Sequence, residues 1–243
     1  MPAWAICCWA LLALGVQAEV LRVGFGTNKP PYIFEVEKRG LEYEIIEQAA
    51  AQADFQIEPF FAPMERLHRM LELGQLDAIS TTNEHSGVRA FYSKPYIEYH
   101  NVAVALAARN LDIRSIADLG RYSVSAFQRA RKLLGAEFQA MADKNPHYRE
   151  EAQQVVRNRL LYARRIDVVV GDRRIIEYFN QELLKTGGVA DARQPVTWYP
   201  VFPATPYQLG FRQEALRDRF NVGLDTLRRS GDYSALEKKY AVY

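Results

Sequence analysis

The residues that could do chemistry are spread thinly along this chain of 243 residues. Both cysteines, Cys7 and Cys8, lie in the apolar opening stretch, and the histidines are scattered at His68, His85, His100 and His147. This distribution contains no constellation typical of a metal site, a nucleophile triad or a phosphate-binding loop. The chemistry that remains is non-covalent binding by charged and hydroxyl side chains.

Three polar residues follow the ends of expected strands. Thr81 and Thr82 follow the apolar run 76–80, and Asp172 follows the run 168–171. In open α/β sheets, ligands bind beyond the carboxyl ends of strands. We therefore expect these side chains to contact a ligand. Helix capping is the alternative for Asp172, because Asp is favoured at helix N-termini.

Strand and helix patterns alternate around these residues. Short apolar runs predict strands over residues 21–25, 55–60, 76–80, 168–171 and 209–211. Apolar residues at helical spacing predict helices over residues 41–53, 64–73, 130–141, 216–227 and 233–240. The alternation predicts an α/β architecture with largely parallel sheets.

Two stretches share one pattern. The helix-to-strand sequence from Arg69 to Ile79 is echoed from Arg159 to Val169. Two similarly built α/β units would produce this echo, so we expect two related lobes. We interpret the extended apolar runs 102–107 and 196–201 as two hinge crossings between them.

Residues 1–18 have the pattern of an export signal. They carry no charge, contain an apolar run at 10–14 and end in Val16-Gln17-Ala18. This predicts a secretory signal peptide cleaved after Ala18. The alternative, a membrane anchor, is disfavoured because the run is far shorter than the roughly 20 residues that span a bilayer. Both cysteines precede the apolar run, which argues against attachment of a lipid to either of them. We therefore expect a soluble protein in the periplasm, and we expect it to be a monomer.

The charge balance argues against a nucleic-acid partner. The chain has 31 basic and 29 acidic residues, a formal net charge of +2. Nucleic-acid-binding proteins carry a much larger basic excess. The local basic clusters 129–132 and 157–165 are interpreted as solvated helix faces.

Taken in order, several short motifs resemble the family 3 extracellular solute-binding proteins, which deliver amino acids and related solutes to ABC transporters. The likeness covers nearly the whole mature chain. It rests on Pro30-Pro31-Tyr32, Gly40-Leu41, Leu76-Asp77-Ala78-Ile79, Tyr92-Ser93-Lys94-Pro95-Tyr96, the run from Arg165 to Asp172, and the ending from Phe220 to Tyr233.

The resemblance implies an α/β, two-lobed periplasmic-binding-protein type II fold with two hinge crossings. Lobe 1 would comprise residues 19–98 and 206–243, and lobe 2 residues 99–205. The lobes would close over a small polar molecule, an amino acid or a close relative, without catalysis and without a cofactor. The implied partner is the permease of an ABC transporter.

An amino-acid ligand needs an acceptor for its ammonium group and a surface for its side chain. The resemblance assigns Asp172 to the ammonium group. It assigns Tyr32 to stacking, with core packing as the alternative. Thr81 and Thr82 would donate hydroxyl groups.

The carboxylate of such a ligand needs a cation, and here the chain departs from the family pattern. The family uses a bidentate arginine, but His85 occupies that place in this sequence. We expect Arg89 to serve instead, with surface exposure as the alternative. In lobe 2, residues 126–130 replace the glycine-threonine loop of the family. Gln128 and Arg129 of this segment are therefore candidate ligand-binding residues. Arg129 could supply the cation or remain solvated.

Two other functions stay open. Cyclohexadienyl dehydratases resemble solute-binding proteins overall, and an enzyme of that kind would need a positioned acid, for which Glu84, Glu98 and Asp172 are the candidates. A ligand sensor would dock its closed form to a membrane kinase instead of a permease. Fold alone does not decide between these functions.

Overall fold

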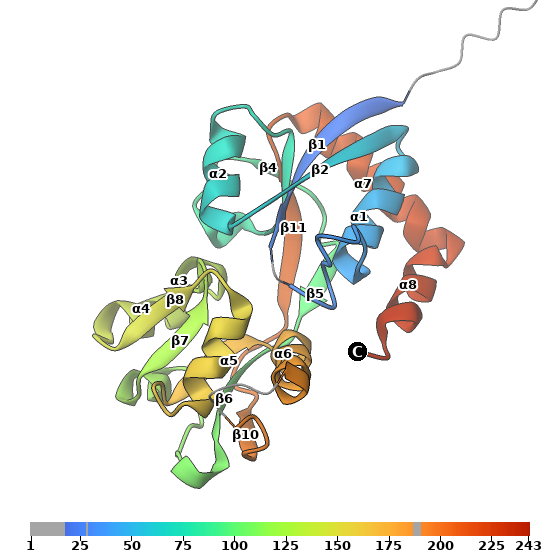
Figure 1. Cartoon of the computed structure of the whole chain (residues 1–243). Helices are drawn as coiled ribbons and strands as arrows, with labels where there is room; N and C mark the ends of the chain where they lie inside the picture. Colours follow the sequence, from blue (N-terminus) through green and yellow to red (C-terminus); the bar gives the residue numbers. More distant parts are fainter. Residues whose placement is uncertain (1–17, 28, 187–190) are drawn as a thin grey trace, which may run out of the picture.

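The computed structural model describes residues 18–27, 29–186 and 191–243. Nearly all of the predicted signal peptide, residues 1–17, therefore lies outside the described residues. Two β-sheets organise the rest of the chain, one in each of two lobes (Figure 1). Lobe 1 carries the first sheet and lobe 2 the second.

The first sheet has the strand order β2-β1-β3-β11-β4, with β5 pairing β11 off this path. Strand β1 is parallel to both β2 and β3, whereas β11 is antiparallel to β3, β4 and β5. Strand β11 returns from near the end of the chain, so both chain ends contribute to lobe 1. The strands are β1 (Glu19–Gly26), β2 (Phe55–Ala62), β3 (Ala78–Thr82), β4 (Phe91–Tyr92), β5 (Ile97–Tyr99) and β11 (Thr205–Phe211).

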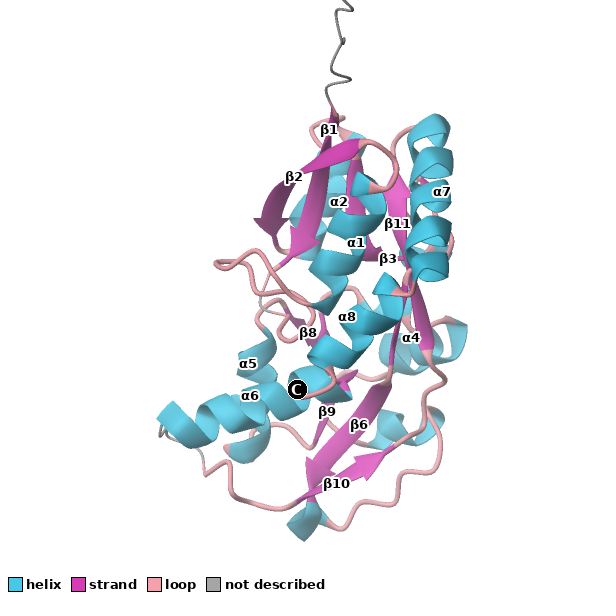
Figure 2. Ribbon diagram, turned by 90° about the vertical axis from the view of Figure 1, so that its right-hand side faces the viewer, coloured by secondary structure: helices cyan, strands magenta, loops and turns pink. Residues whose placement is uncertain are grey.

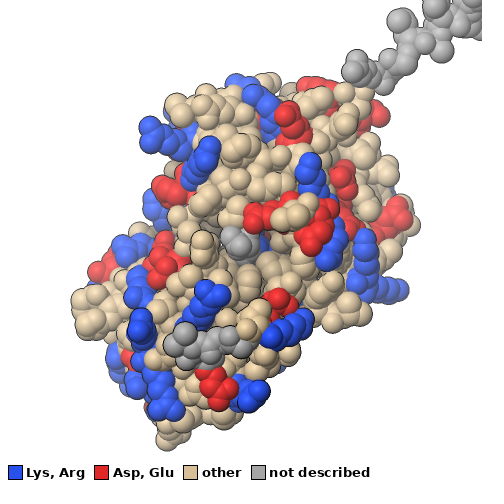
Figure 3. Space-filling view, viewed as in Figure 1, with Lys and Arg blue, Asp and Glu red and all other residues tan. Residues whose placement is uncertain are grey.

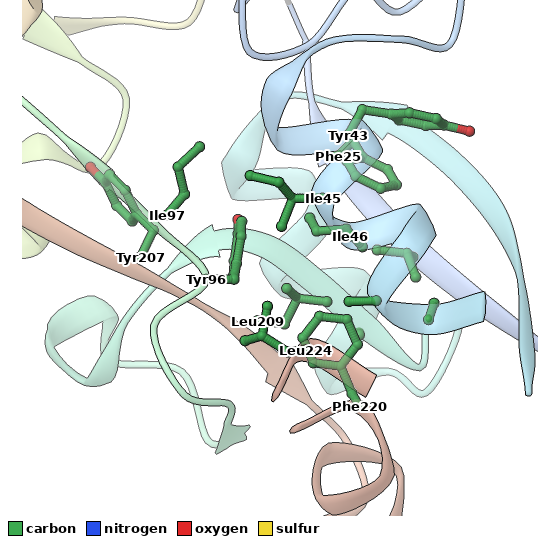
Figure 4. Close-up of a cluster of buried hydrophobic side chains, with 14 of the residues drawn as sticks. Phe25, Tyr43, Ile45, Ile46, Tyr96, Ile97, Tyr207, Leu209, Phe220 and Leu224 are labelled. Carbon is green, nitrogen blue, oxygen red and sulfur yellow. The ribbon is translucent and has the colours of Figure 1, made fainter. Parts of the chain in front are cut away.

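Helices cover both faces of this sheet. Helices α1 (Leu41–Ala51), α7 (Glu214–Ser230) and α8 (Asp232–Tyr240) lie on one face, and α2 (Met64–Glu72) packs against the other (Figures 1 and 2). Figure 4 shows part of the larger core, where Phe220 and Leu224 of α7 lie close to Leu209 of β11. The predicted helices at 41–53, 64–73, 216–227 and 233–240 are thus present, because each carries one continuous apolar face.

The second sheet has the strand order β10-β6-β9-β7-β8. Strand β7 is parallel to β8 and β9, and β6 is antiparallel to β9 and β10. Two apolar clusters flank the sheet, one with α5 and α6 and the other with α3 and α4. The elements are β6 (Asn101–Leu106), β7 (Val124–Phe127), α3 (Ala130–Leu133), α4 (Ala136–Lys144), β8 (Tyr148–Glu151), α5 (Gln154–Tyr162), β9 (Val168–Asp172), α6 (Arg173–Thr186) and β10 (Val196–Tyr199).

Two predicted elements are corrected by the structure. The helix expected over 130–141 is two helices, α3 and α4, because Gly135 between them has φ 88° and breaks the helical path. The strand expected over 76–80 begins at Ala78 and includes Thr81 and Thr82, which therefore end the strand and do not follow it.

The predicted hinge crossings were also misplaced. The runs 102–107 and 196–201 contain β6 and β10, which pair with each other inside the second sheet. They are apolar because they are strands of that sheet; every residue of β6 is buried. The chain crosses between the sheets at His100, which separates β5 from β6, and over residues 200–204, which separate β10 from β11. The lobe boundaries predicted at 98/99 and 205/206 stay a prediction.

The surface carries both signs of charge. On the face shown in Figure 3, basic and acidic side chains are interspersed over both lobes. Among the described residues, no helix is both long enough and apolar enough to cross a bilayer.

Candidate functional site

The central pocket lies where the two sheets meet, and both lobes line it. Lobe 1 contributes Gly26, Thr27, Lys29, Pro63, Met64, Thr81, Tyr99 and Tyr207. Lobe 2 contributes Asn101, Phe127, Gln128, Leu133, Ala152, Gln154, Arg157, Asp172 and Ile175. Strand ends β1, β3 and β9 all reach the pocket, as expected for an α/β ligand site.

The pocket is narrow in this conformation, with a cavity volume of about 40 Å³. A single water needs roughly 10 to 15 Å³ by the same measure. The pocket therefore has room for a few waters, and a larger solute would require its walls to move apart.

Lys29 is a buried cation of lobe 1 on the pocket wall. Its side chain is 6% exposed, and its Nζ lies 3.5 Å from Oε2 of Glu42 and within hydrogen-bonding distance of Oγ1 of Thr81. A Cβ atom at Gly26 would lie 2.9 Å from Cε of Lys29. The absence of a side chain at Gly26 therefore makes room for the ammonium group.

Glu42, the partner of Lys29, is fully buried on α1. Thr81 Oγ1, Tyr96 Oη and Tyr99 Oη each donate to its carboxylate at 2.5 Å. Burial alone would raise the pKa of Glu42, but Lys29 and the three hydroxyl donors together hold it below its ordinary value. This pair and its donors form a complete network inside lobe 1.

Thr81 has an unusual backbone at the pocket. Its φ is 52°, although it is β-branched and stands in a strand. That conformation is sterically costly for such a residue. Its amide donates to Oη of Tyr96 at 2.9 Å, and its hydroxyl joins the Glu42 network. Such strained positions cluster at functional sites.

Asp172 ends β9 on the lobe 2 side and is 3% exposed. Its Oδ1 accepts from the amides of Arg174 and Ile175, and its Oδ2 accepts from the amide of His100 and Oη of Tyr32, at 2.9 to 3.2 Å. Burial raises its pKa to about 6. The helix-capping alternative for Asp172 is therefore realised at the start of α6. A ligand ammonium would have to share or replace one of these donors.

Arg157 corrects the prediction that the cluster 157–165 is a solvated face. Arg157 is 1% exposed on α5, whereas Arg159 of the same helix is exposed. Its Nη1 donates to the carbonyl oxygen of Val170, and its Nε has no partner among the described residues. Burial lowers its pKa to about 10. A Cβ at Gly171 would collide with the guanidinium, so this glycine makes its place on β9 possible.

Two neutral side chains of the pocket also have unused hydrogen-bonding capacity. Asn101 and Gln154 are buried, and neither Oδ1 of Asn101 nor Oε1 of Gln154 has a partner among the described residues. Buried polar atoms are nearly always hydrogen-bonded in folded proteins. The pocket wall therefore offers acceptors as well as the donor of Arg157 to a polar guest.

Four predicted site residues lie on this wall or directly behind it. Thr81, Gln128 and Asp172 line the pocket. Tyr32 lies behind it, with its ring stacked on that of Tyr99 at a centroid distance of 4.0 Å. Of this stacked pair, it is therefore Tyr99 that faces the pocket.

The other predicted residues lie elsewhere. Thr82 is fully buried in β3 away from the pocket lining, and Arg89 is exposed. His85 lines a separate groove with Asn83 and Leu133. Arg129 binds lobe 1, because its guanidinium contacts Oε2 of Glu65 and the carbonyl oxygen of Ser86, each at 2.6 Å. It thus joins the lobes outside the central pocket.

Sequence reasoning missed Lys29, Asn101, Gln154 and Arg157. Little in the sequence distinguishes Arg157 from the exposed arginines beside it. The available signals were two glycines: Gly26 ends the first strand, and Gly171 directly precedes Asp172 in another strand. A glycine in a strand often marks close approach by another group.

The acids considered for catalysis do not converge. Asp172 lines the central pocket, Glu84 lines the groove of His85, and Glu98 lines a third hollow with Arg174. Within the described ranges, no cluster of three or more His, Cys, Asp or Glu residues could hold a metal ion.

Comparison with known proteins agrees with this architecture. Residues 21–242 match the bacterial extracellular solute-binding proteins, family 3. A probable amino-acid-binding protein, YxeM of Bacillus subtilis (strain 168), is 26% identical over 228 residues, which cover 91% of this chain and 83% of that protein.

Two solved structures share the fold. A histidine kinase sensor domain with similarity to periplasmic binding proteins has a TM-score of 0.74 at 20% identity, over 92% of this chain and 96% of that one. An ancestral arginine-binding protein bound to arginine has a TM-score of 0.73 at 20% identity, over 92% and 99%. With its two-lobed type II periplasmic-binding-protein fold, the chain belongs to the family 3 bacterial extracellular solute-binding proteins.

Proposed function

We propose that this protein captures an amino acid or a closely related small polar solute in the central pocket. The proposal rests on buried polar atoms of three residues of the pocket wall, Asn101, Gln154 and Arg157, because these atoms have no partner among the described residues. Leaving such atoms unpaired costs about 1 to 3 kcal/mol each. A polar guest between the lobes would satisfy donors and acceptors together, which supports a binding role.

The partner and the compartment belong to the same proposal. The predicted signal peptide and the family support export to the periplasm and delivery to the permease of an ABC transporter. The amino-acid-binding relative supports the class of solute. We propose that the exported protein works as a monomer.

The test is a thermal-shift screen of the purified mature protein against amino acids, polyamines, opines and small carboxylates. A ligand that binds only the folded state raises its melting temperature by mass action. Small-angle scattering with a hit should show a smaller radius of gyration. A screen in which amino acids and their relatives produce no shift would contradict the proposed solute class.

Asp172 keeps its proposed contact with a ligand ammonium group. In the bound state the ammonium would replace the hydroxyl of Tyr32, which among the described residues is the one side-chain donor to the Asp172 carboxylate. Asp172→Asn should then weaken binding of an amino-acid hit by roughly 2 to 5 kcal/mol, as truncation of a buried charge pair does. Isothermal titration measures this, and wild-type affinity in the variant would leave Asp172 with its capping role alone.

Sensing is the second candidate, favoured by the likeness to a histidine kinase sensor domain. Both functions use the same closing pocket, so binding measurements do not separate them. Deleting the gene does: loss of uptake of the radiolabelled solute indicates transport, and loss of a transcriptional response with intact uptake indicates sensing.

A further inference from the structure

Arg157 stands out because its charge has no counter-charge in contact with it. The described residues include no ion pair that involves Arg157, and its one hydrogen bond runs from Nη1 to a neutral carbonyl oxygen, that of Val170. The side chain is nevertheless 1% exposed and lines the central pocket. Burying an unpaired charge is strongly unfavourable unless a partner is supplied.

The nearby acidic residues are occupied by other groups. Asp172 and Glu151 are the acids whose charges influence Arg157. The two oxygens of Asp172 already accept from Tyr32 and from backbone amides. Glu151 is paired with Arg149, with Nε to Oε1 at 3.3 Å. Neither acid contacts the guanidinium, so its partner has to come from the pocket.

The geometry of the free edge indicates what that partner is. Because Nη1 donates to the carbonyl oxygen of Val170, the edge of the guanidinium formed by Nε and Nη2 remains available to a ligand. Two parallel N–H donors at this spacing match the two oxygens of a carboxylate. The other cation on the pocket wall, Lys29, already has Glu42 as its partner.

We propose that Arg157 binds the carboxylate of the captured solute, so that the anion-recognising group of this protein comes from lobe 2. The inference rests on the proposed function, which it deepens by requiring a carboxylate on the ligand. Arg157 takes the place of the arginine that His85 replaces in the sequence motif, since His85 lies in another groove. Gly171 holds this place open, because a side chain there would displace the guanidinium.

Acetate is a suitable first probe, because it is one of the smallest carboxylates. Melting temperatures are measured in sodium acetate and in sodium chloride at equal ionic strength for the wild type, Arg157→Met and Arg159→Met. Arg159 is the matched control, an exposed arginine on the same helix. Acetate should raise the melting temperature of the wild type and of Arg159→Met but not of Arg157→Met. Without acetate, Arg157→Met should melt at or above the wild-type temperature, because it buries no charge.

A second comparison uses matched solutes with and without the carboxylate: L-arginine against agmatine, and L-ornithine against putrescine. Any amino acid that binds should lose roughly 30-fold or more in affinity in Arg157→Met. Arg157→Lys keeps the charge but not the two-pronged donor, so it should bind with intermediate affinity. It also serves as the test variant if the methionine variant does not fold.

The outcomes separate the two proposals. An amino acid bound with wild-type affinity by Arg157→Met or Arg157→Lys overturns the role of Arg157 and leaves the proposed function standing. Protection by acetate that depends on Arg157, without binding of any amino acid, supports the carboxylate site and removes the amino-acid proposal. An acetate effect that is equal in all variants, or absent from the wild type, overturns the inference.

Discussion

Lys29 and Arg157 are two buried cations on opposite walls of one pocket, and their surroundings differ. Lys29 has Glu42 as a counter-ion within its own lobe, and hydroxyl groups complete the network. Arg157 donates to a backbone carbonyl oxygen, and its Nε has no partner in the part of the chain that the structure describes. A glycine leaves room for each side chain, Gly26 for Lys29 and Gly171 for Arg157, so the two cations do not differ in this respect.

The difference distinguishes a buried cation that stabilises its own lobe from a buried cation that is available to bind a ligand. A buried ion pair that is internally complete contributes to the shape and rigidity of its lobe and has nothing left to offer a guest. A buried cation without a counter-ion lowers the stability of the empty protein and regains that free energy when an anion binds. We therefore expect lobe 1 variants to lose stability and lobe 2 variants to lose binding.

The largest expected effect is on the lobe 1 side, from Glu42→Gln. This variant leaves Lys29 buried without a counter-ion, which should cost about 3 to 5 kcal/mol in the free energy of unfolding. Urea unfolding of the ligand-free protein measures it. Glu47→Gln on the same helix is the control, and because Glu47 is exposed its effect should stay within about 0.5 kcal/mol. Equal losses in the two variants would remove the structural role of the Lys29–Glu42 pair.

The second prediction concerns the pH dependence that Asp172 confers. Its pKa is raised from 3.8 to about 6 in the folded protein, because burial disfavours the charged carboxylate. Between these pH values the folded state binds the proton more tightly, so the contribution of Asp172 to stability falls as pH rises. The size should be roughly 1 to 3 kcal/mol between about pH 4 and pH 6.5.

The measurement is the difference in free energy of unfolding between the wild type and Asp172→Asn at several pH values. Subtraction cancels the acids with lowered pKa, such as Asp77, which affect both proteins alike. The wild type should lose stability relative to the variant as pH rises. A flat difference across this window would mean that Asp172 is ionised without penalty in the fold.

A smaller effect, about 1 to 2 kcal/mol, is expected from filling either glycine. Gly26→Ala would push the Lys29 side chain and the Sδ atom of Met64, which lie 2.9 and 3.1 Å from the added Cβ, and should lower stability. Gly171→Ala would displace the guanidinium of Arg157 and should lower the affinity for acetate. Gly120→Ala is the control, since its nearest neighbour, Met141, would lie 3.8 Å away. If Gly26→Ala and Gly171→Ala changed stability and acetate affinity to the same extent, the proposed difference between Lys29 and Arg157 would be wrong.

The fold was largely predictable because its signals are local. The helix at 64–73 carries Leu67 and Leu71 on one face, and such spacing predicts the buried side without knowledge of its partner. Breaks inside an element were harder to predict. Gly135 divides one predicted helix because it takes a positive φ, which the apolar pattern does not reveal.

The site was less predictable because burial of a charge is a tertiary property. Arg157 and Arg159 have the same side chain two positions apart on α5, yet only Arg157 meets the backbone of β9. Asp172 was found because it ends a strand, which is a local feature. Lys29 and Glu42 are separated in sequence and are brought together only by the packing of α1 beside β1, so neither residue alone indicated an ion pair.

The smallest expected effect concerns a third cation, Arg129, whose partners lie in the opposite lobe. Its ion pair with Glu65 measures 2.6 Å, but the Glu65 side chain is 66% exposed, so solvent screens the attraction. Such a pair contributes about 1 kcal/mol or less. Because the pair joins the lobes, that free energy favours the closed form. Arg129→Met also removes the hydrogen bond to the carbonyl oxygen of Ser86, so it should raise the fraction of open ligand-free protein about fivefold or more.

The control for Arg129 is Arg131→Met. Arg131 pairs with Asp143 at 3.0 Å within lobe 2, so its loss changes the surface charge equally without affecting closure. Small-angle scattering of both ligand-free variants should show a larger radius of gyration for Arg129→Met alone, and added salt should bring the wild type toward it, since screening weakens the exposed pair. The same shift in both variants would indicate general charge repulsion. Arg129 pairs with an exposed acid, Glu65, whereas Lys29 pairs with a buried acid, Glu42. The contact between the lobes can therefore open while the Lys29–Glu42 network inside lobe 1 stays intact.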